Sequence, residues 1–335
     1  MTPKILTIGT AYMDMLVRLP KLPEQDTSVV VEEGGISYLP DGAGACCAVA
    51  LSKLGAKSFL LTRLGQDVHG HRLYTTLGER GVDTSSVVVD PALPTGMNVV
   101  ILEDPLKQRS MLYPGANATL SRADLAHAFA QVPDAICLQM NIPEAVIIEA
   151  AKGASERHIP IFLDAKGITR EFPLTALPEV EVFSPNEIET EILTGIRPTG
   201  SESCLKAVLE LVKLVKARYY VIKVGDRGAF ISDGRHFNLI SPYVVKPVDT
   251  AGVGDAFLAG LAMEYLQTRG DLTAACKMAN TVSAMTIMRA GTFDAFPTME
   301  EVQAFMKELK MISQVFFPFS SYMLSTLRIQ TRNYS

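Results

Sequence analysis

The sequence predicts an α/β protein built on a mainly parallel sheet, with a small β-sheet lid. The chain has 335 residues, 48% of them hydrophobic, so it can bury one large core or two modest ones. Short apolar runs alternate with longer amphipathic segments, and this rhythm is typical of βαβ units around a parallel sheet. The strands expected from these runs cover residues 5–8, 58–61, 135–138, 161–163, 180–183 and 219–224.

Two stretches interrupt the alternation, roughly residues 15–40 and 93–115. Within them, Ser28–Glu33 and Met97–Leu102 have the pattern of exposed, antiparallel-type strands. We therefore expect these two excursions from the main sheet to form the lid.

The chain shows no internal repeat and no Pro/Ser-rich linker, which favours a single domain over residues 1–312. A helix is expected at about residues 298–311. The remaining tail, residues 313–335, has aromatic residues but no clear period. It is either a frayed end or a docking strand or oligomer contact.

Charge, hydropathy and cysteine content argue against a nucleic-acid-binding, membrane or secreted protein. The net charge of -5 comes from interspersed acidic and basic residues, without the Lys/Arg stripe that a nucleic-acid partner requires. No apolar run reaches membrane-spanning length, and the first residues do not resemble a signal peptide. The five cysteines are scattered at positions 46, 47, 137, 204 and 276 and form no C-x-x-C pair. This pattern suits a reducing compartment, so we expect a cytoplasmic protein.

The most informative segment is Val248–Gly260, where a strand end meets two glycines and then an apolar helix. Gly252 and Gly254 permit a tight turn, and the backbone amides of Gly252, Val253, Gly254 and Asp255 would point out of the helix N-terminus. Such amides stabilise the negative charge that develops on a phosphate. Asp255 stands beside them, either as a reactive carboxylate or only as the N-cap of the helix.

The run Asp249-Thr-Ala-Gly-Val-Gly-Asp255 resembles the carboxy-terminal signature of the ribokinase-like (PfkB) carbohydrate kinases, usually Asp-Thr-x-Gly-Ala-Gly-Asp. Val253 replaces the usual small residue, which removes no backbone donor. The resemblance implies a doubly wound sheet with a β lid and an ATP-dependent kinase. It also implies that Asp255 takes the proton from a substrate hydroxyl as that oxygen attacks the γ-phosphate in line. A homodimer formed through the lid is a further expectation.

Ser184-Pro-Asn-Glu187 is expected to open a helix, with Ser184 as the N-cap and Glu187 closing a capping box. That interpretation leaves Asn186 and Glu189, which lie three residues apart on one helical face, without a structural role. They match the Asn-x-x-Glu motif of the family, which implies that they position Mg²⁺ and the phosphates through water. The alternative is a solvated polar face.

The segment Tyr219–Gly228 reads as a buried strand that ends in a glycine turn. In the family the corresponding turn lies against the nucleotide, and a helical Ala-Asn segment flanks the adenine. The resemblance thus nominates Lys223, Gly225, Gly228 and Asn280 as ATP contacts, together with Gly254. It also allows a K⁺ ion, whose candidate ligands are Asp249, Ala251, Thr286, Arg289 and Gly291.

Asp14 follows the first strand, at the place where family members use an aspartate to accept hydrogen bonds from sugar hydroxyls. Asp41–Gly55 resembles the first family signature, Gly-Gly-x-x-x-Asn, but Asp41 replaces its first glycine and Cys46 its asparagine. Tyr12 and Asn141 stand where ribose-specific members have an asparagine and a glutamate. The substrate contacts implied by the resemblance are Tyr12, Asp14, Gly42, Cys46 and Asn141.

These departures leave the acceptor open among ribose, another sugar, a sugar acid and a nucleoside. A sugar- or nucleotide-binding regulator without catalysis is a further alternative. A Rossmann dehydrogenase would need Gly-x-Gly-x-x-Gly after the first strand, whereas the chain has Gly9-Thr-Ala-Tyr12 there. A P-loop NTPase would need Gly-x4-Gly-Lys-Ser/Thr, and the sequence lacks that pattern.

Overall fold

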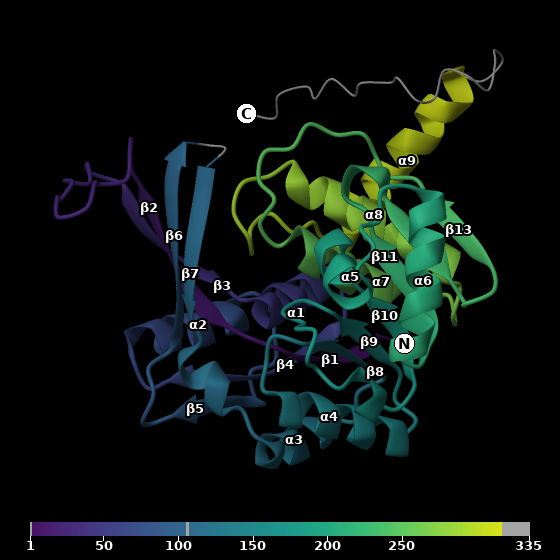
Figure 1. Ribbon diagram of the computed structural model, residues 1–335, viewed down its shortest axis with the longest axis horizontal. Coiled ribbons are helices and arrows are strands. Elements are labelled where there is room, and N and C mark those ends of the chain that lie inside the picture. Colours follow the sequence, from purple (N-terminus) through teal and green to yellow (C-terminus); the bar gives the residue numbers. More distant parts are fainter. Residues whose placement is uncertain (1, 105–106, 317–335) are drawn as a thin grey trace.

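The computed structural model describes residues 2–104 and 107–316, and it confirms the α/β fold (Figure 1). Within these residues nine strands form one sheet in the order β13-β12-β11-β10-β9-β8-β1-β4-β5. All neighbouring pairs from β11 to β5 are parallel, and the two pairs that involve β12 are antiparallel. The strands are β1 (Lys4–Ile8), β4 (Lys57–Gly65), β5 (Val87–Asp90), β8 (Ala135–Gln139), β9 (Ile161–Asp164), β10 (Val180–Ser184), β11 (Ala217–Lys223), β12 (Ala229–Ser232) and β13 (Phe237–Ile240).

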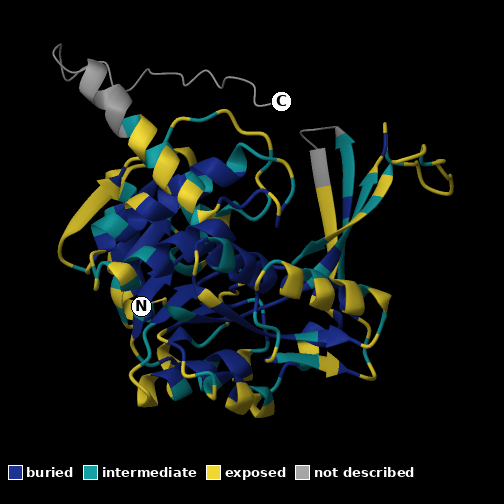
Figure 2. Cartoon of the chain, turned by 180° about the vertical axis from the view of Figure 1, so that it is seen from behind, coloured by how far each residue is buried: buried dark blue, intermediate teal, exposed yellow. Residues whose placement is uncertain are grey.

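Each of the six predicted apolar runs lies in a strand of this sheet, because a strand covered on both faces must be apolar along its whole length. Successive residues of β1 show the consequence: Ile5 packs into the core on one face, and Leu6 packs into the core on the other. Figure 2 shows the central strands of the sheet in the dark blue of buried residues.

Helices cover both faces of the sheet, so the predicted doubly wound arrangement is confirmed. One face carries α1 (Ala43–Lys53), α2 (Val68–Glu79), α7 (Val253–Gln267) and α8 (Leu272–Ile287). The other carries α3 (Arg122–Phe129), α4 (Glu144–Glu156) and α6 (Ser201–Leu214). The chain also forms α5 (Glu187–Thr194) and α9 (Met299–Phe316).

A second sheet forms from the two excursions, in the order β3-β2-β6-β7, and its longest strands stand out from the body in Figure 1. Its strands are β2 (Tyr12–Arg18), β3 (Ile36–Asp41), β6 (Gly96–Asp104) and β7 (Lys107–Tyr113). The expected strand at Met97–Leu102 is present in β6, which pairs antiparallel with β7 but parallel with β2. The expected strand at Ser28–Glu33 was wrong: this segment is not a strand, and Val30 is 90% exposed, so its alternating pattern has no sheet face to serve.

Helix α9 begins within one residue of its predicted start and runs to Phe316, past the expected domain boundary. Residues 317–335, most of the segment that the sequence interpretation treats as a tail, lie outside the described residues. Among the helices that the structure describes, none combines the length and apolarity needed to cross a bilayer.

The parallel strands bring four polar residues to one edge of the sheet. Gln139, Asp164, Ser184 and Lys223 are the last residues of β8, β9, β10 and β11. Gln139 is in register with Asp164, and Asp164 with Ser184. In open α/β sheets ligands bind outside this carboxyl edge, near the point where the strand order reverses. Here that point lies between β1 and β8.

Candidate active site

Asp255 lies in the first turn of α7, at the carboxyl edge of the sheet, and is 2% exposed. The N-cap of this helix is Gly252, in the left-handed conformation with φ of 70°, so the reading of Asp255 as a mere N-cap was wrong. A Cβ on Gly252 would also lie 2.9 Å from the Phe296 ring. The amides of Val253, Gly254 and Asp255 have no carbonyl four residues back within the helix, which leaves them available to an anion.

Two side chains from neighbouring strand ends hold the Asp255 carboxylate. The Lys166 ammonium lies 3.1 Å from Oδ2 and 3.4 Å from Oδ1, and the Gln139 amide donates to Oδ1 at 3.2 Å. Burial raises the pKa of Asp255 to about 6, with the positive charge of Lys166 opposing that rise. A carboxylate with such a pKa is ionised at neutral pH and can still accept a proton in a transition state.

Lys166 and Gln139 were missed by the sequence interpretation. Each is a single polar residue near the end of an apolar run, and neither belongs to a motif. Their positions in the sequence could have identified them, because polar residues at the ends of adjacent parallel strands meet at the carboxyl edge of the sheet. Gly9 also gains an explanation, since a Cβ there would lie 2.2 Å from Oε1 of Gln139.

A cavity of about 450 Å³ opens in front of Asp255. It is lined by ten predicted site residues, namely Asn186, Glu189, Lys223, Gly225, Gly228, Gly252, Val253, Gly254, Asp255 and Asn280, and also by Asp164 and Lys166. Residues predicted from four separate segments of the sequence thus meet in one cavity. Gln139 supports Asp255 from behind without lining the cavity.

The start of α5 differs from its prediction. Its N-cap is Asn186 rather than Ser184, and Asn186 forms a capping box with Glu189: Asn186 Oδ1 accepts from the Glu189 amide at 2.9 Å, and Glu189 Oε2 accepts from the Asn186 amide at 2.7 Å. Ser184 stays extended because it is the last residue of β10, in register with Asp164. Asn186 and Glu189 therefore do have a structural role, contrary to the sequence interpretation. Glu187 is the first residue of α5 and does not close the box.

Glu189 is nevertheless placed for more than capping. It is 8% exposed and lines the cavity. Burial raises the pKa of Glu189, the nearby Asp164 carboxylate adds to this rise, and the Lys223 ammonium opposes it. The structure therefore gathers two carboxylates and one ammonium in the wall of the cavity.

The predicted nucleotide contacts are partly engaged with the protein itself. The Lys223 ammonium pairs with Asp164 at 2.7 Å, so it forms part of the cavity floor. Gly228 has a φ of 95°, and a Cβ there would lie 2.1 Å from the Ile240 carbonyl oxygen. The Asn280 amide donates to that same carbonyl at 3.2 Å and to that of Ser241 at 3.1 Å. These contacts close the cavity wall between β11 and α8.

The candidate K⁺ residues adjoin one another through Asp249. Its carboxylate accepts from the Ala251 amide and from the Gly291 amide, both at 3.0 Å. The Arg289 guanidinium turns away to pair with Glu301 at 2.7 Å. The Thr286 hydroxyl donates to the Val282 carbonyl within α8 at 2.8 Å. The structure thus joins the two loops but engages the side chains of Arg289 and Thr286 elsewhere.

The predicted substrate contacts of the lid form a cluster of polar residues. Asp14 on β2 lies opposite Asn98 on β6 and accepts a hydrogen bond from its amide at 3.1 Å. Asp41 at the end of β3 pairs with Tyr12 in register. Burial, together with the neighbouring Asp41 carboxylate, raises the pKa of Asp14 to about 8. Asp14 is therefore largely protonated at neutral pH.

Cys46 lies between this cluster and Gly252, the N-cap of α7. Its thiol donates to Asp41 Oδ1 at 2.9 Å, and its sulfur would be 4.0 Å from a Cβ on Gly252. Asn141 donates to the Thr10 hydroxyl at 2.9 Å, while its buried Oδ1 has no partner among the described residues. Gly42, the N-cap of α1, has a φ of 112°. A Cβ at this position would lie 2.5 Å from Ala11, so packing by itself requires glycine there.

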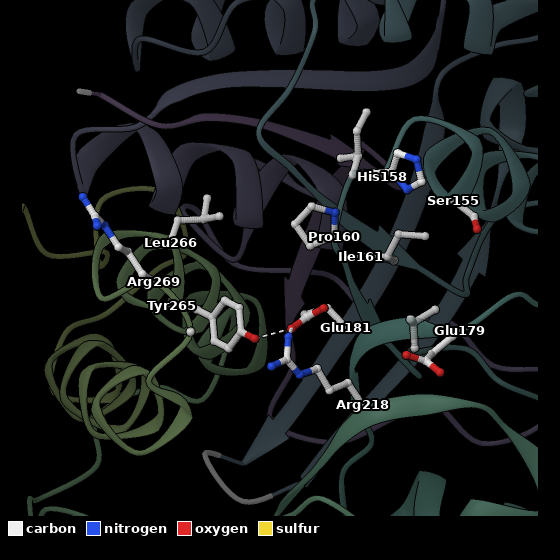
Figure 3. Close-up of a pocket in the computed structure, with 13 residues that line it drawn as sticks. Ser155, His158, Pro160, Ile161, Glu179, Glu181, Arg218, Tyr265, Leu266 and Arg269 are labelled. Atoms are coloured by element: carbon white, nitrogen blue, oxygen red, sulfur yellow. Dashed lines mark hydrogen bonds and ion pairs between the residues drawn. The ribbon is translucent and has the colours of Figure 1, made fainter.

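A larger hollow, of about 570 Å³, lies at the opposite, amino edge of the sheet. Figure 3 shows Glu181 between Tyr265 and Arg218 in this hollow, where it accepts from the tyrosine hydroxyl and pairs with the guanidinium at 3.0 Å. None of the predicted site residues lines it. The smaller cavity in front of Asp255 is therefore the candidate active site.

Comparison with known families agrees with this geometry. Residues 2–299 match the pfkB family carbohydrate kinase. The chain belongs to this family. It is therefore an ATP-dependent phosphotransferase that acts on an alcohol group of a sugar or sugar-like molecule, as the signature around Asp255 predicted.

Similar proteins support the same assignment for this kinase. The deoxyribokinase of Salmonella typhi is 26% identical over 304 residues, which cover 90% of this chain and 98% of the relative. The ribokinase of Bacillus subtilis is 28% identical over 303 residues, which cover 89% and 98%. The structure of Arabidopsis thaliana ribokinase complexed with ribose and ATP superposes with a TM-score of 0.84 and 26% identity, covering 92% of this chain and 99% of that one.

Proposed function

We propose that this kinase transfers the γ-phosphoryl group of ATP to a sugar hydroxyl, with Asp255 as the general base. The observation that supports this most strongly is the position of Asp255. Its carboxylate is buried and held by two donors, and it belongs to the same helical turn as the amides that would bind the phosphoryl oxygens.

The step follows from this arrangement. The acceptor hydroxyl donates its proton to Asp255, its oxygen forms a bond to the γ-phosphorus, and the bond from that phosphorus to the bridging oxygen of ADP breaks. ADP leaves with the bond's electron pair. The amides of Val253, Gly254 and Asp255 stabilise the charge on the phosphoryl oxygens during transfer.

We propose that Mg²⁺ accompanies the nucleotide near Glu189 and Asn186. The nearly buried Glu189 carboxylate and the Asn186 amide supply oxygen donors, which a hard, hydrated ion prefers. The described residues contain no group of three or more His, Cys, Asp or Glu side chains that could hold a metal alone. This donor set fits an ion held largely by phosphate and water. Bound there, Mg²⁺ would neutralise phosphate charge.

Replacing Glu189 by glutamine is expected to raise the Mg²⁺ concentration needed for half-maximal rate. Glutamine keeps an oxygen that can accept from the Asn186 amide, so the cap of α5 is retained while the negative charge is lost. The measurement is initial rate against Mg²⁺ at fixed ATP, with thermal unfolding as the control. An unchanged Mg²⁺ titration would reduce Glu189 to a capping residue.

We propose that ribose is not the primary acceptor and that the Tyr12, Asp14, Asp41, Cys46 and Asn141 cluster selects another sugar or a related hydroxyl compound. The relatives named ribokinase and deoxyribokinase make pentoses the first compounds to test. ADP release should be measured with pentoses, hexoses, sugar acids and nucleosides. One acceptor class is expected to give ATP-dependent turnover well above the solvent background. A nucleoside as best acceptor would establish a nucleoside kinase, and no turnover with any compound would favour a regulator.

We infer that the lid forms a homodimer in a reducing compartment such as the cytoplasm. The lid exposes a set of apolar side chains, namely Ile36, Tyr38, Leu39, Met111, Leu112 and Tyr113. They lie on β3 and β7, the two edge strands of the lid sheet, and an exposed apolar edge strand can pair with another chain. The five cysteines are all unpaired and buried, which suits a reducing compartment. Sedimentation of the full chain tests the dimer.

A further inference from the structure

Lys166 contacts the catalytic carboxylate from a fixed point of the fold. It lies two residues after the end of β9, and its backbone amide donates to Oδ1 of Asp164, the last residue of that strand, at 2.9 Å. Its ammonium then reaches both oxygens of Asp255, at 3.1 and 3.4 Å. The side chain of Asp255 is 3% exposed, whereas that of Lys166 is 44% exposed. Lys166 is therefore the more exposed member of this ion pair.

The other cations that line the cavity have different partners. Lys223 pairs with Asp164 at 2.7 Å, and Arg197 pairs with Glu191 at 2.8 Å. Among the described residues, Lys166 is thus the cation in ion-pair contact with Asp255. A buried carboxylate without a cation carries a large desolvation cost, so this contact favours the charged form of Asp255.

Several other groups act on Asp255 from the elements around it. Burial raises the pKa of Asp255 most, and the carboxylates of Asp164 and Asp41 add to this rise, while Lys166 lowers it. The charged and titratable groups that face it are Lys166 and Asp164 at the end of β9, Lys223 on β11, Asp41 on β3, and the thiols of Cys46 and Cys47 on α1. Three carboxylates thus gather near the acceptor site, and Lys166 is the positive charge in contact with the reacting one.

We propose that Lys166 is a positioning residue for phosphoryl transfer, which neutralises the buried Asp255 carboxylate and orients its two oxygens toward the acceptor hydroxyl. This inference rests on the proposed role of Asp255 as general base. Gln139 completes the arrangement from the buried side by donating to Oδ1 at 3.2 Å. With one oxygen shared between Gln139 and Lys166, the carboxylate cannot rotate freely. Asp255 and Lys166 both line the cavity, so the acceptor hydroxyl would arrive beside this pair.

The test compares Lys166→Met with Lys166→Arg and with the control Lys206→Met. Methionine keeps the length of the stem and removes the charge, while arginine keeps the charge. Lys206 is an exposed lysine on α6 that pairs with Glu202 at 2.7 Å and does not line the cavity. The acceptor is the best substrate of the ADP-release panel. The measurements are kcat and kcat/KM from pH 5 to pH 9, and the KM for ATP.

Lys166→Met is expected to lower kcat/KM at pH 7 by about tenfold or more and to move the acid limb of the pH profile to higher pH, because the uncompensated carboxylate holds its proton more tightly. Its rate should recover as the pH rises. Lys166→Arg should keep the acid limb near its native position, and Lys206→Met should match the native enzyme throughout. A purely structural role for Lys166 would lower the rate without moving the limb.

A second variant keeps the proposal testable if Lys166→Met folds poorly. Lys166→Ala removes the stem from Cγ onward, and added n-propylammonium has the size and charge of the missing part. Partial recovery of kcat that saturates with n-propylammonium, and that n-propanol does not reproduce, is expected.

An unmoved acid limb together with no amine rescue would overturn the role of Lys166. If Asp255→Asn is inactive in that case, the general base stands and the inference about Lys166 alone fails. If Asp255→Asn also turns over normally, the proposed mechanism fails with it.

Discussion

Replacing Asp255 by asparagine is expected to lower kcat by about 10²–10⁴-fold, the usual contribution of a positioned general base. Affinity for ATP should stay within a few-fold, because the amides of Val253, Gly254 and residue 255 belong to the backbone and survive the change. Single-turnover kinetics and equilibrium binding of ATP measure the two effects separately.

The stability of this variant is a control with a definite sign. Burial raises the pKa of Asp255 in the folded protein from 3.8 to about 6. Ionising Asp255 therefore costs the folded protein more than the unfolded chain, and stability falls as the pH rises from about 4 to about 6. Asparagine mimics the neutral form. The Tm of Asp255→Asn at pH 7.5 should therefore be no lower than that of the native enzyme. Near-normal turnover in a well-folded Asp255→Asn would show that another group removes the proton.

Replacing Asp14 by alanine is expected to lower kcat/KM for the best acceptor by about 30-fold to 10⁴-fold, because it leaves two acceptor hydroxyls unpaired at a cost of about 1–3 kcal/mol each. Removing Asp14 also removes its repulsion with the neighbouring Asp41 carboxylate, which raises the pKa of Asp14. The fold should consequently tolerate the change. The measurement is kcat/KM with each acceptor of the panel, beside the KM for ATP and the Tm.

The matched variant Asn98→Ala removes the amide that donates to Asp14 at 3.1 Å but keeps the carboxylate. It should cost less than Asp14→Ala. Equal activity of Asp14→Ala and the native enzyme would remove Asp14 from the substrate site. If kcat/KM in the native enzyme is clearly highest for ribose, then the interpretation of Tyr12, Cys46 and Asn141 is wrong, although the kinase assignment is unaffected.

The main sheet could be predicted because strands buried on both faces need continuous apolar runs, and the sequence carries six of them. The lid was harder. Its strands are exposed on one side, so their alternation is weak evidence, and the similar pattern of Ser28–Glu33 forms no strand. The N-cap of α5 was misplaced by two residues for a related reason, because serine and asparagine cap equally well and only the end of β10 decides between them.

The sequence by itself determined the parts of the site that are local. Gly252 and Asp255 lie within one helical turn, so the motif alone predicts a carboxylate beside the free backbone amides of a helix N-terminus. The tertiary structure decided what surrounds that carboxylate. Lys166 is 89 residues from Asp255 and Gln139 is 116 residues away, and no local pattern relates them. They meet because parallel strands end at the same edge of the sheet, which turns residues that are remote in sequence into direct partners.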